Sequence, residues 1–483
     1  MHTADALLVG CLFVVGAAIA IPYTREVLWR RRWLLSGILA TVVAIEIVLH
    51  RFYWQLLPAD LAYLSLAIAC AAISSAQGLR LRVIALFSLL LASVSLASLI
   101  VLPVFSLPRP DGPYAVGTRI VHLVDESRSD SAFPSGHREL MVQVWYPAES
   151  ASGPLAPYRR WRETTLLSSY DAFHKTHSHL NAPVAKRGGP FPVLLFNPAW
   201  GGERTQNTYQ TEDLASHGYI VIAIDHTHNS SLVAFPDGQV VKATRMPSID
   251  DFRHATFQQQ MRVAGKELDA QVADDIFVLN SFSAMNSSTG SPWYRALDMQ
   301  RVGALGHSFG GAVAVETCFR DGRVKAAMNM DGWMYGSISK DVLRKPLFVM
   351  YESGWPPDAK VLAEESASRA PSDRMDIWDR DNLERTLAGY GGYVLTIEGT
   401  KHMNFADRSL YSPLRSLTDS GPINPALAHR IINAYTLAFF DYALRGKVEP
   451  LMNESRSPYA MARFERWGNA STTARARSSS VGN

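Results

Sequence analysis

Cysteine is scarce in this sequence, and neither sign of charge is in clear excess. The three cysteines among 483 residues, Cys11, Cys70 and Cys318, are too few and too far apart for a disulfide scaffold or a structural zinc site. Lysine and arginine (47) nearly balance aspartate and glutamate (44), which gives a formal net charge of +3. With 47% hydrophobic residues, this balance argues against a disordered chain and against a protein that coats nucleic acid.

The hydrophobic residues are concentrated in four long runs near the N-terminus. These runs are Ala6–Tyr23, Trp33–Leu49, Leu61–Ala76 and Val83–Phe105. A membrane-spanning helix needs about 20 apolar residues, and the third run reaches this length only with Leu56 and Leu57. The first run lacks the basic segment that precedes the apolar part of a cleaved signal peptide. We therefore expect residues 1–106 to form a four-helix transmembrane region.

Basic residues between the runs predict the orientation, because Lys and Arg are retained on the cytoplasmic side of a membrane. The first loop carries four arginines between residues 25 and 32, and the third carries Arg80 and Arg82, whereas the second has only Arg51. Both ends of the region should then face away from the cytoplasm. This predicts a multi-pass protein of the cell membrane whose C-terminal part is extracytoplasmic.

The chain changes character after a proline-rich linker at residues 107–115. Between residues 116 and 448, seven strand-like runs alternate with segments of helical period: Leu140–Tyr146, Val193–Phe196, Ile220–Ile224, Val302–Leu305, Ala326–Met330, Leu347–Tyr351 and Tyr393–Ile397. Their nearly continuous apolar character is typical of strands covered on both faces. We predict an α/β fold with a mostly parallel sheet and helices on both faces.

Two helices and the C-terminal tail can be placed more closely. A helix at about Glu203–His217, ended by Gly218, joins two of the strands in a βαβ unit. Asn424 followed by Pro425 should open a long helix with apolar residues at helical spacing. Residues 449–483 are polar, and we expect a disordered tail there.

The clearest chemical signal is the sequence Gly306-His307-Ser308-Phe309-Gly310-Gly311, between a strand-like run and a helical stretch. A G-x-S-x-G turn between strand and helix exposes its serine, and the small residues on either side let the backbones pass. This context predicts Ser308 as a nucleophile. The backbone N–H of Phe309 and one N–H from the loop after Val193–Phe196 should then hold the oxyanion.

A serine nucleophile needs a base, and the base needs an acid to orient it. In an α/β-hydrolase the chain order is serine, acid, histidine, and His402 lies in the turn after the last strand-like run, where that order requires the base. The acid is open at this point, because Asp331 and Glu352 both end strands. Three more acids, Asp358, Asp376 and Asp379, lie in a polar segment and should be solvated.

The sequence resembles the plasma-type platelet-activating factor acetylhydrolase family of α/β-hydrolases. The matching segments are Met141–Pro147, Asp213–Gly218, Gly306–Gly311, Met330–Met334 and His402–Asp407. In that family the acid follows the strand after the nucleophile's helix, so the resemblance implies Asp331 rather than Glu352. It also implies Trp200 as the second oxyanion donor, although Pro198-Ala199 stands where the family usually has His-Gly.

Two further motifs are expected to have no catalytic role. Pro134-Ser135-Gly136-His137 matches the core of a lipid-phosphatase motif without its flanking residues, so we expect a loop before a strand. His174, His177 and His179 have metal-like spacing, but the nearest acid is Asp171, and we expect no metal site there. Residues 154–186, which contain these histidines, are a better candidate for a lid.

The residues together predict a membrane-anchored serine ester hydrolase with no metal, no organic cofactor and no nucleic-acid partner. The resemblance implies short or oxidised acyl chains on glycerophospholipids, or other small esters, as substrates. One alternative is a broad-specificity carboxylesterase or lipase with no phospholipid preference. The other is a non-catalytic membrane protein that uses a hydrolase fold for binding, which the intact set of Ser308, Asp331 and His402 argues against.

Overall fold

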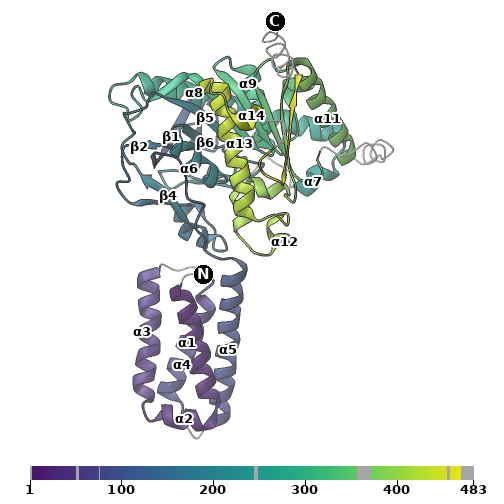
Figure 1. The fold of residues 1–483 in the computed structure, drawn as a ribbon. Helices are drawn as coiled ribbons and strands as arrows, with labels where there is room; N and C mark the ends of the chain where they lie inside the picture. Colours follow the sequence, from purple (N-terminus) through teal and green to yellow (C-terminus); the bar gives the residue numbers. More distant parts are fainter. Residues whose placement is uncertain are drawn as a thin grey trace. The chain divides into compact units, whose positions relative to one another are not determined.

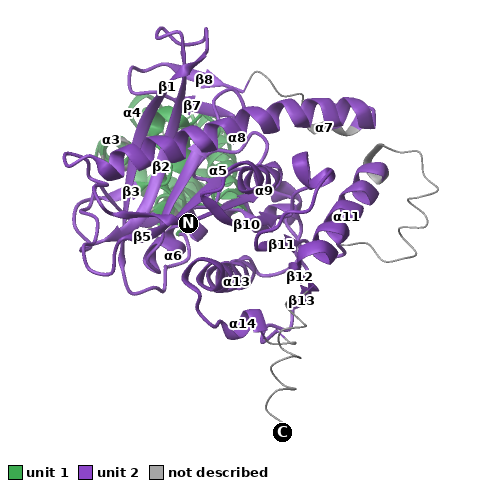
Figure 2. Cartoon of the chain, turned by 90° about the horizontal axis from the view of Figure 1, so that it is seen from above, with its two compact units in different colours: residues 1–106, 157–175, 410–414 green, residues 107–156, 176–409, 415–483 purple. Residues whose placement is uncertain are grey.

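The computed structural model describes residues 3–50, 54–74, 77–243, 249–355, 371–453 and 457–468. The chain divides into two compact units, shown in green and purple in Figure 2. The first unit comprises residues 1–106, 157–175 and 410–414, and the second comprises residues 107–156, 176–409 and 415–483. Two short segments from the later part of the chain therefore belong to the N-terminal unit.

The first unit consists mainly of helices, and the long ones run alongside one another (Figure 1). These helices are α1 (Thr3–Ala20), α2 (Pro22–Trp29), α3 (Arg32–His50), α4 (Leu57–Ala72) and α5 (Gly78–Val101). Small residues line the contact between α4 and α5, where Ala59, Ala62, Ala85 and Ala92 are fully buried. The Ser95 hydroxyl accepts a hydrogen bond from the Ala59 N–H at 2.9 Å. Small side chains let the two helix backbones approach closely.

The four predicted hydrophobic runs correspond to α1, α3, α4 and α5, but the membrane prediction is supported only in part. Among the described residues, α5 alone is long and apolar enough to cross a membrane as a single helix. Helices α1 and α2 reach that length only together, and they are bent by 101° at Pro22, which has no N–H to continue α1. Helix α4, at 16 residues, is short for a span. One span, or two if the bent pair counts, replaces the expected four.

The second unit is built on an 11-stranded sheet of order β13-β12-β11-β10-β9-β5-β6-β2-β1-β4-β3. Its strands are β1 (Ala115–Ser129), β2 (His137–Ala148), β3 (Leu155–Pro157), β4 (Lys175–Leu180), β5 (Phe191–Asn197), β6 (Ile220–Asp225), β9 (Leu297–His307), β10 (Val324–Met330), β11 (Leu347–Tyr351), β12 (Gly392–Ile397) and β13 (Ala462–Trp467). Strands β7 (Leu232–Ala234) and β8 (Val240–Lys242) form a separate hairpin. The strands that are neighbours in the middle of this sheet, in the order β12-β11-β10-β9-β5-β6, run parallel to one another.

Helices cover both faces of this sheet (Figure 2). Helices α6 (Thr208–Ser216) and α13 (Pro425–Arg445) pack on one face. Helices α8 (Phe257–Ser287), α9 (Phe309–Arg320) and α11 (Pro371–Tyr390) lie on the other. The short helices α7 (Ile249–His254), α12 (Arg415–Thr418) and α14 (Pro450–Asn453) complete the described set. The mixed α/β fold with a mostly parallel sheet is thus confirmed, with all seven predicted strands at their expected places.

Helix α6 begins later than predicted, at Thr208 instead of Glu203. The carboxylate of Asp407, far along the chain, accepts hydrogen bonds from the backbone N–H groups of Thr208 at 2.7 Å and Tyr209 at 3.1 Å. A carboxylate at a helix N-terminus satisfies N–H groups that have no partner within the helix. The start of α6 is therefore set by a remote side chain.

The polar C-terminal stretch is more ordered than expected. Residues 449–468, assigned to a disordered tail, contain α14 and the edge strand β13, which pairs antiparallel with β12. Phe464 of β13 stacks on Tyr393 of β12, with ring centroids 5.8 Å apart, which supplies an apolar contact that the overall polarity of the stretch conceals. Residues 469–483 lie outside the described part of the chain.

Candidate active site

Ser308 occupies the sharp turn between β9 and α9. Its backbone has φ 57° and ψ −127°, a strained conformation for a residue with a Cβ. Its N–H donates to the Met330 carbonyl at 2.7 Å, which ties the turn to the neighbouring strand β10. A Cβ on Gly306 would lie 2.1 Å from the Gly310 oxygen. The small residues on either side of Ser308 are therefore required by the geometry, as predicted.

The loop after β5 lies directly against this turn. A Cβ on Gly310 would lie 2.1 Å from the Asn197 oxygen and 2.4 Å from the Pro198 oxygen, so the two backbones are in contact. The side chains of Trp200 and Phe309 meet edge to face, with ring centroids 5.2 Å apart. The two residues predicted to donate N–H groups to an oxyanion therefore lie side by side next to Ser308.

A buried polar network that the sequence did not predict holds the start of this loop, where β5 ends. Asn197, the last residue of β5, donates from Nδ2 to Asp275 at 2.9 Å, and its Oδ1 lies 2.9 Å from His226 Nε2. Burial raises the pKa of Asp275 to about 7, while its hydrogen bonds and His226 act in the opposite direction. These partners come from α8 and from the residue after β6, and no spacing in the sequence indicates that they meet.

His402 and Asp331 are brought together from the carboxyl ends of parallel strands. His402 Nδ1 lies 2.6 Å from Asp331 Oδ2. Asp331 directly follows β10 with φ 59°, and its other oxygen accepts the Glu352 N–H at 2.9 Å. A carboxylate bound to Nδ1 holds the proton on that nitrogen. Nε2 is then the ring nitrogen that can accept a proton.

Burial favours the neutral form of the acids around Asp331. It raises the pKa of Glu352 to about 7, and the charge of Asp331 adds to the shift. Asp379 is fully buried rather than solvated, accepts a hydrogen bond from the Met334 N–H, and has its pKa raised by burial to about 8. Asp376 accepts from the Trp333 indole N–H at 3.1 Å, and Asp358 lies outside the described residues. Asp331 is the acid whose carboxylate contacts the His402 ring, whereas the Glu352 carboxyl has a hydrogen bond with the His402 backbone.

The electrostatic surroundings of His402 favour its protonated form. Burial of the ring acts to lower the pKa of His402, but the hydrogen bond and charge of Asp331 outweigh it, with smaller contributions from Glu352 and Asp419. The net effect is a pKa above the ordinary value of 6.5. A histidine in this setting can take up a proton and hold it as an imidazolium.

A second histidine, His429, also follows Ser308 in the sequence, so position alone does not identify the base. The His429 ring is buried against Tyr209, with centroids 3.7 Å apart, and its Nε2 lies 3.0 Å from the Ser409 hydroxyl. Burial lowers the pKa of His429 to about 4. Its contacts are those of a core residue, which leaves His402 as the candidate base.

The histidines with metal-like spacing have separate partners. His174 stacks on Phe105, with ring centroids 3.8 Å apart, His177 Nε2 lies 3.0 Å from the Leu107 carbonyl, and His179 Nδ1 lies 3.0 Å from the Gly153 carbonyl. Within the described ranges, the one trio of potential metal ligands whose atoms lie within 4.8 Å of one another is a different set, Asp111, Asp213 and His217.

The two remaining sequence motifs are accounted for by the fold. Residues 134–136 precede β2 and form part of a turn in which the Gly136 N–H donates to Phe133, as predicted for that motif. The expected lid at residues 154–186 is divided between the two units, since residues 157–175 belong to the first.

Comparison with known proteins places this chain in a family of esterases. The family described as "Platelet-activating factor acetylhydrolase, isoform II" matches residues 100–450. The chain is 30% identical over 398 residues to a "Probable 1-alkyl-2-acetylglycerophosphocholine esterase" of Arthroderma benhamiae, which covers 74% of this chain and 92% of the relative. It is 23% identical over 364 residues to the platelet-activating factor acetylhydrolase of Cavia porcellus, covering 69% and 77% of the two chains.

A solved structure agrees with these relatives. The ferulic acid esterase from Streptomyces cinnamoneus has a TM-score of 0.57 and 30% sequence identity, and it covers 75% of this chain and 99% of its own. The matched residues 100–450 include Ser308, Asp331 and His402. The resemblance noted in the sequence is confirmed: this chain belongs to the platelet-activating factor acetylhydrolase, isoform II, family and is an ester hydrolase.

Proposed function

We propose that the protein is a membrane-anchored serine hydrolase that cleaves short-acyl phospholipids or other small esters through an acyl-enzyme. The observation that carries this proposal is the 2.6 Å contact between His402 Nδ1 and Asp331, beside a serine held in a strained turn. Such a pair activates a serine hydroxyl, which is a weak nucleophile on its own. The family and the fungal relative support a phospholipid ester as the substrate class.

In the proposed mechanism, Ser308 Oγ attacks the ester carbonyl carbon while His402 Nε2 removes the hydroxyl proton. Asp331 keeps the ring in the correct tautomer and stabilises the imidazolium. The N–H groups of Phe309 and Trp200 hold the oxyanion of the tetrahedral intermediate. His402 then returns the proton to the leaving alcohol, and water releases the acyl group in a second cycle of the same steps.

A broad-specificity carboxylesterase is the second candidate, and one observation favours it. The ring of Trp200 packs against Phe252 at 5.0 Å and Phe309 at 5.2 Å between centroids, and Phe309 packs against Tyr335 at 5.8 Å. We propose that the exposed part of this aromatic cluster borders the acyl group, where it would favour flat acyl groups, because ring pairs gain energy beyond simple burial. The structural similarity to a ferulic acid esterase is in line with this alternative.

A substrate panel distinguishes the two candidates. We expect the full chain to hydrolyse a phosphatidylcholine with an acetyl group at position 2 with a higher kcat/KM than p-nitrophenyl acetate or methyl ferulate. A phosphatidylcholine with two long acyl chains serves as the control for acyl length. A kcat/KM for methyl ferulate above that for the short-acyl phospholipid would support the carboxylesterase instead.

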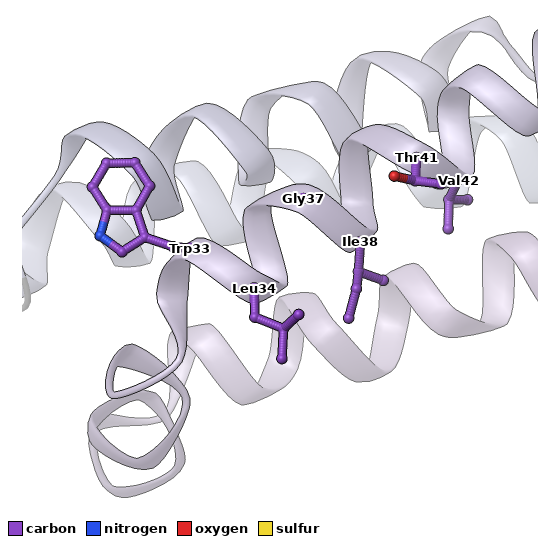
Figure 3. A pocket seen from close by; sticks show the side chains of 6 residues that line it. All are labelled: Trp33, Leu34, Gly37, Ile38, Thr41 and Val42. Atoms are coloured by element: carbon purple, nitrogen blue, oxygen red, sulfur yellow. The ribbon is translucent and has the colours of Figure 1, made fainter.

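We propose further that residues 1–106 anchor the enzyme in a bilayer, with α5 as the helix that crosses it and α1, α3 and α4 packed beside it. Large apolar side chains on these helices are at least half exposed, among them Val14, Ile38, Ile68, Leu86 and Leu90. A hollow of about 390 Å³ on α3 is lined by Trp33, Leu34, Gly37, Ile38, Thr41 and Val42 (Figure 3). An apolar surface of this kind is unfavourable in water and suits lipid acyl chains.

The proposed orientation places the hydrolase unit outside the cytoplasm. The arginine-rich segment around α2 and the loop after α4 lie at the same end of the helices, because Trp29 Nε1 donates to the Ile73 carbonyl at 3.1 Å and Arg32 Nη1 donates to the same oxygen at 3.2 Å. Both basic loops therefore mark one side, which the positive-inside rule assigns to the cytoplasm.

Alkaline extraction tests the anchor. We expect the full chain to stay in the membrane pellet at pH 11 and to enter solution only with detergent, because an apolar helix buried in lipid is not displaced by a change in charge. A peripheral protein held by electrostatic contacts serves as the control and should be released. Release of the full chain into the supernatant would contradict the anchor, and protease cleavage of the C-terminal segment only in opened right-side-out vesicles would contradict the orientation.

The pH profile should report His402. The base must be neutral to accept the serine proton, so kcat/KM should fall as the pH drops through the pKa of His402 in the free enzyme. Because Asp331 and Glu352 raise this pKa, the midpoint should lie above 6.5. Initial rates between pH 5 and 9 with a neutral ester measure it. A midpoint below 6.5 would contradict the role of Asp331 as the partner of His402.

A further inference from the structure

The loop that carries Trp200 is held in place by the side chain of Gln206, which has no role in the mechanism above. Gln206 Oε1 accepts a hydrogen bond from the Ala199 N–H at 2.9 Å. Its Nε2 lies 2.6 Å from Nδ1 of His307, the residue before the nucleophile. Gln206 therefore joins the oxyanion loop to the turn that presents Ser308.

The second ring nitrogen of His307 extends this chain of hydrogen bonds to the base. His307 Nε2 lies 3.0 Å from the backbone carbonyl oxygen of His402. A carbonyl can only accept, so Nε2 carries the proton and Nδ1 is the acceptor. Gln206 must then point its NH₂ group at His307 and its oxygen at Ala199, which agrees with both contacts. Each link from Ala199 through Gln206 and His307 to His402 then pairs one donor with one acceptor.

The His307 ring is placed to serve as the middle of such a bridge. It is fully buried, and its centroid lies 4.6 Å from that of His402 and 6.2 Å from that of Phe405. Burial, together with the neighbouring His402, lowers the pKa of His307 well below its ordinary value. The ring is therefore neutral at pH 7 and keeps the lone pair on Nδ1 that Gln206 needs.

The space for the Gln206 amide is left open by Gly202. A Cβ at Gly202 would lie 2.0 Å from Gln206 Oε1. The Gly202 N–H also donates to the Ala199 carbonyl at 2.7 Å. Both backbone polar groups of Ala199 are thus engaged, one by Gln206 and one by Gly202, directly before the residue whose N–H should hold the oxyanion.

We propose that Gln206 is a positioning residue that keeps the oxyanion loop and the loop of His402 in one geometry. The link runs from Ala199 through Gln206 and His307 to the His402 carbonyl. It explains how a loop with Pro198-Ala199 at its start can still hold a backbone donor beside Ser308. The proposal rests on the serine hydrolase function proposed above, because it assigns Gln206 an effect on the rate of that reaction.

A transition-state effect distinguishes this role from a purely structural one. In the full chain, Gln206→Leu keeps the size of the side chain and removes both hydrogen bonds. We expect kcat for p-nitrophenyl acetate to fall about 10- to 100-fold with KM changed by less than about threefold, because a displaced oxyanion donor costs less than the loss of a whole donor. Inhibition by a trifluoromethyl ketone, which forms an oxyanion on Ser308, should weaken by the same factor as kcat/KM.

Two further variants make the test specific. His307→Phe keeps a stacked ring but breaks the bridge at its centre, so the double variant Gln206→Leu/His307→Phe should lose no more than the more affected single variant. Gln239→Leu is the matched control, because it removes a 2.6 Å bond from a half-buried glutamine to the Ala132 carbonyl, outside the bridge and the catalytic residues. Its kcat should equal that of the wild type.

The outcomes distinguish a failure of the positioning role of Gln206 from a failure of the proposed hydrolase function. Folded Gln206→Leu with wild-type kcat and wild-type inhibition would overturn the positioning role, as would additive losses in the double variant. If Gln206→Leu does not fold, His307→Phe and Gln206→Asn report on the same link, and wild-type kcat in both would overturn it. Wild-type protein without turnover and without labelling of Ser308 by a fluorophosphonate would instead contradict the proposed function.

Discussion

Replacing Ser308 with alanine should lower kcat for p-nitrophenyl acetate by about 10⁴- to 10⁶-fold, because the reaction then has no nucleophile and only the binding site and oxyanion donors remain. Labelling by a fluorophosphonate should be lost at the same time. Alanine removes a single oxygen from a half-buried side chain, so the fold should be retained. The measurement is turnover and labelling in the full chain, with thermal unfolding as the check on folding.

Ser281→Ala is a matched control for this variant. Ser281 lies on α8, and its hydroxyl donates to the Phe277 carbonyl at 2.9 Å within the same helix. Loss of that hydroxyl should leave both kcat and labelling at the wild-type level. Equal turnover by wild type and Ser308→Ala would show that the activity does not pass through an acyl-enzyme at this serine.

Asp331→Asn should lower kcat by about 10⁴-fold, because an asparagine that donates to Nδ1 would favour the wrong tautomer of His402. The substitution is well matched in shape. Asp331 has φ 59°, a conformation that asparagine tolerates better than most residues, so the backbone should not be strained further. The expected pH profile changes too, since loss of the neighbouring charge should move the midpoint of His402 to lower pH.

Glu352→Gln is the comparison that decides which acid orients the base. Glu352 donates its backbone N–H to Asp331, and burial raises the pKa of its own carboxyl. Because Asp331, and not Glu352, makes the direct contact with Nδ1, Glu352→Gln should lower kcat by less than about tenfold. A larger loss in Glu352→Gln than in Asp331→Asn would reverse the assignment.

The central strands could be predicted because each has a nearly continuous apolar run. Strand β1 could not, because its 15 residues form no continuous apolar run: they mix buried, half-buried and exposed positions and include Asp125, Glu126 and Arg128. Helix α8 was missed for a related reason. Its buried face carries Asp274, which is paired with Arg138 Nε and Nη2 at 2.6 Å each. A buried carboxylate needs a charged partner, and here that partner, Arg138, is 136 residues away in the sequence. No local sequence pattern indicates this pairing.

The residues of the candidate site also differ in whether local sequence predicts them. Ser308 and His402 follow from local context, because the strained turn and the loop after the last strand can be recognised from neighbouring residues. Asp331 and Glu352 both follow strands, so their positions in the sequence do not distinguish them. The choice depends on which carboxylate contacts Nδ1 of His402, and this is seen only in the structure. Gln206 belongs to no motif. Its side chain contacts Ala199, in the loop before it, and His307, 101 residues away, and only the further contact from His307 to His402 completes the link.

Strand β13 has a practical consequence for work on the isolated hydrolase unit. The family match ends at residue 450, but the sheet continues to Trp467. A chain shortened at the family boundary would leave β12 as an uncovered sheet edge with the apolar residues Tyr393, Val394, Leu395 and Ile397. Uncovered edges of this kind recruit strands from other molecules, so the shortened protein should self-associate and aggregate, and the chain should be kept at least through residue 468.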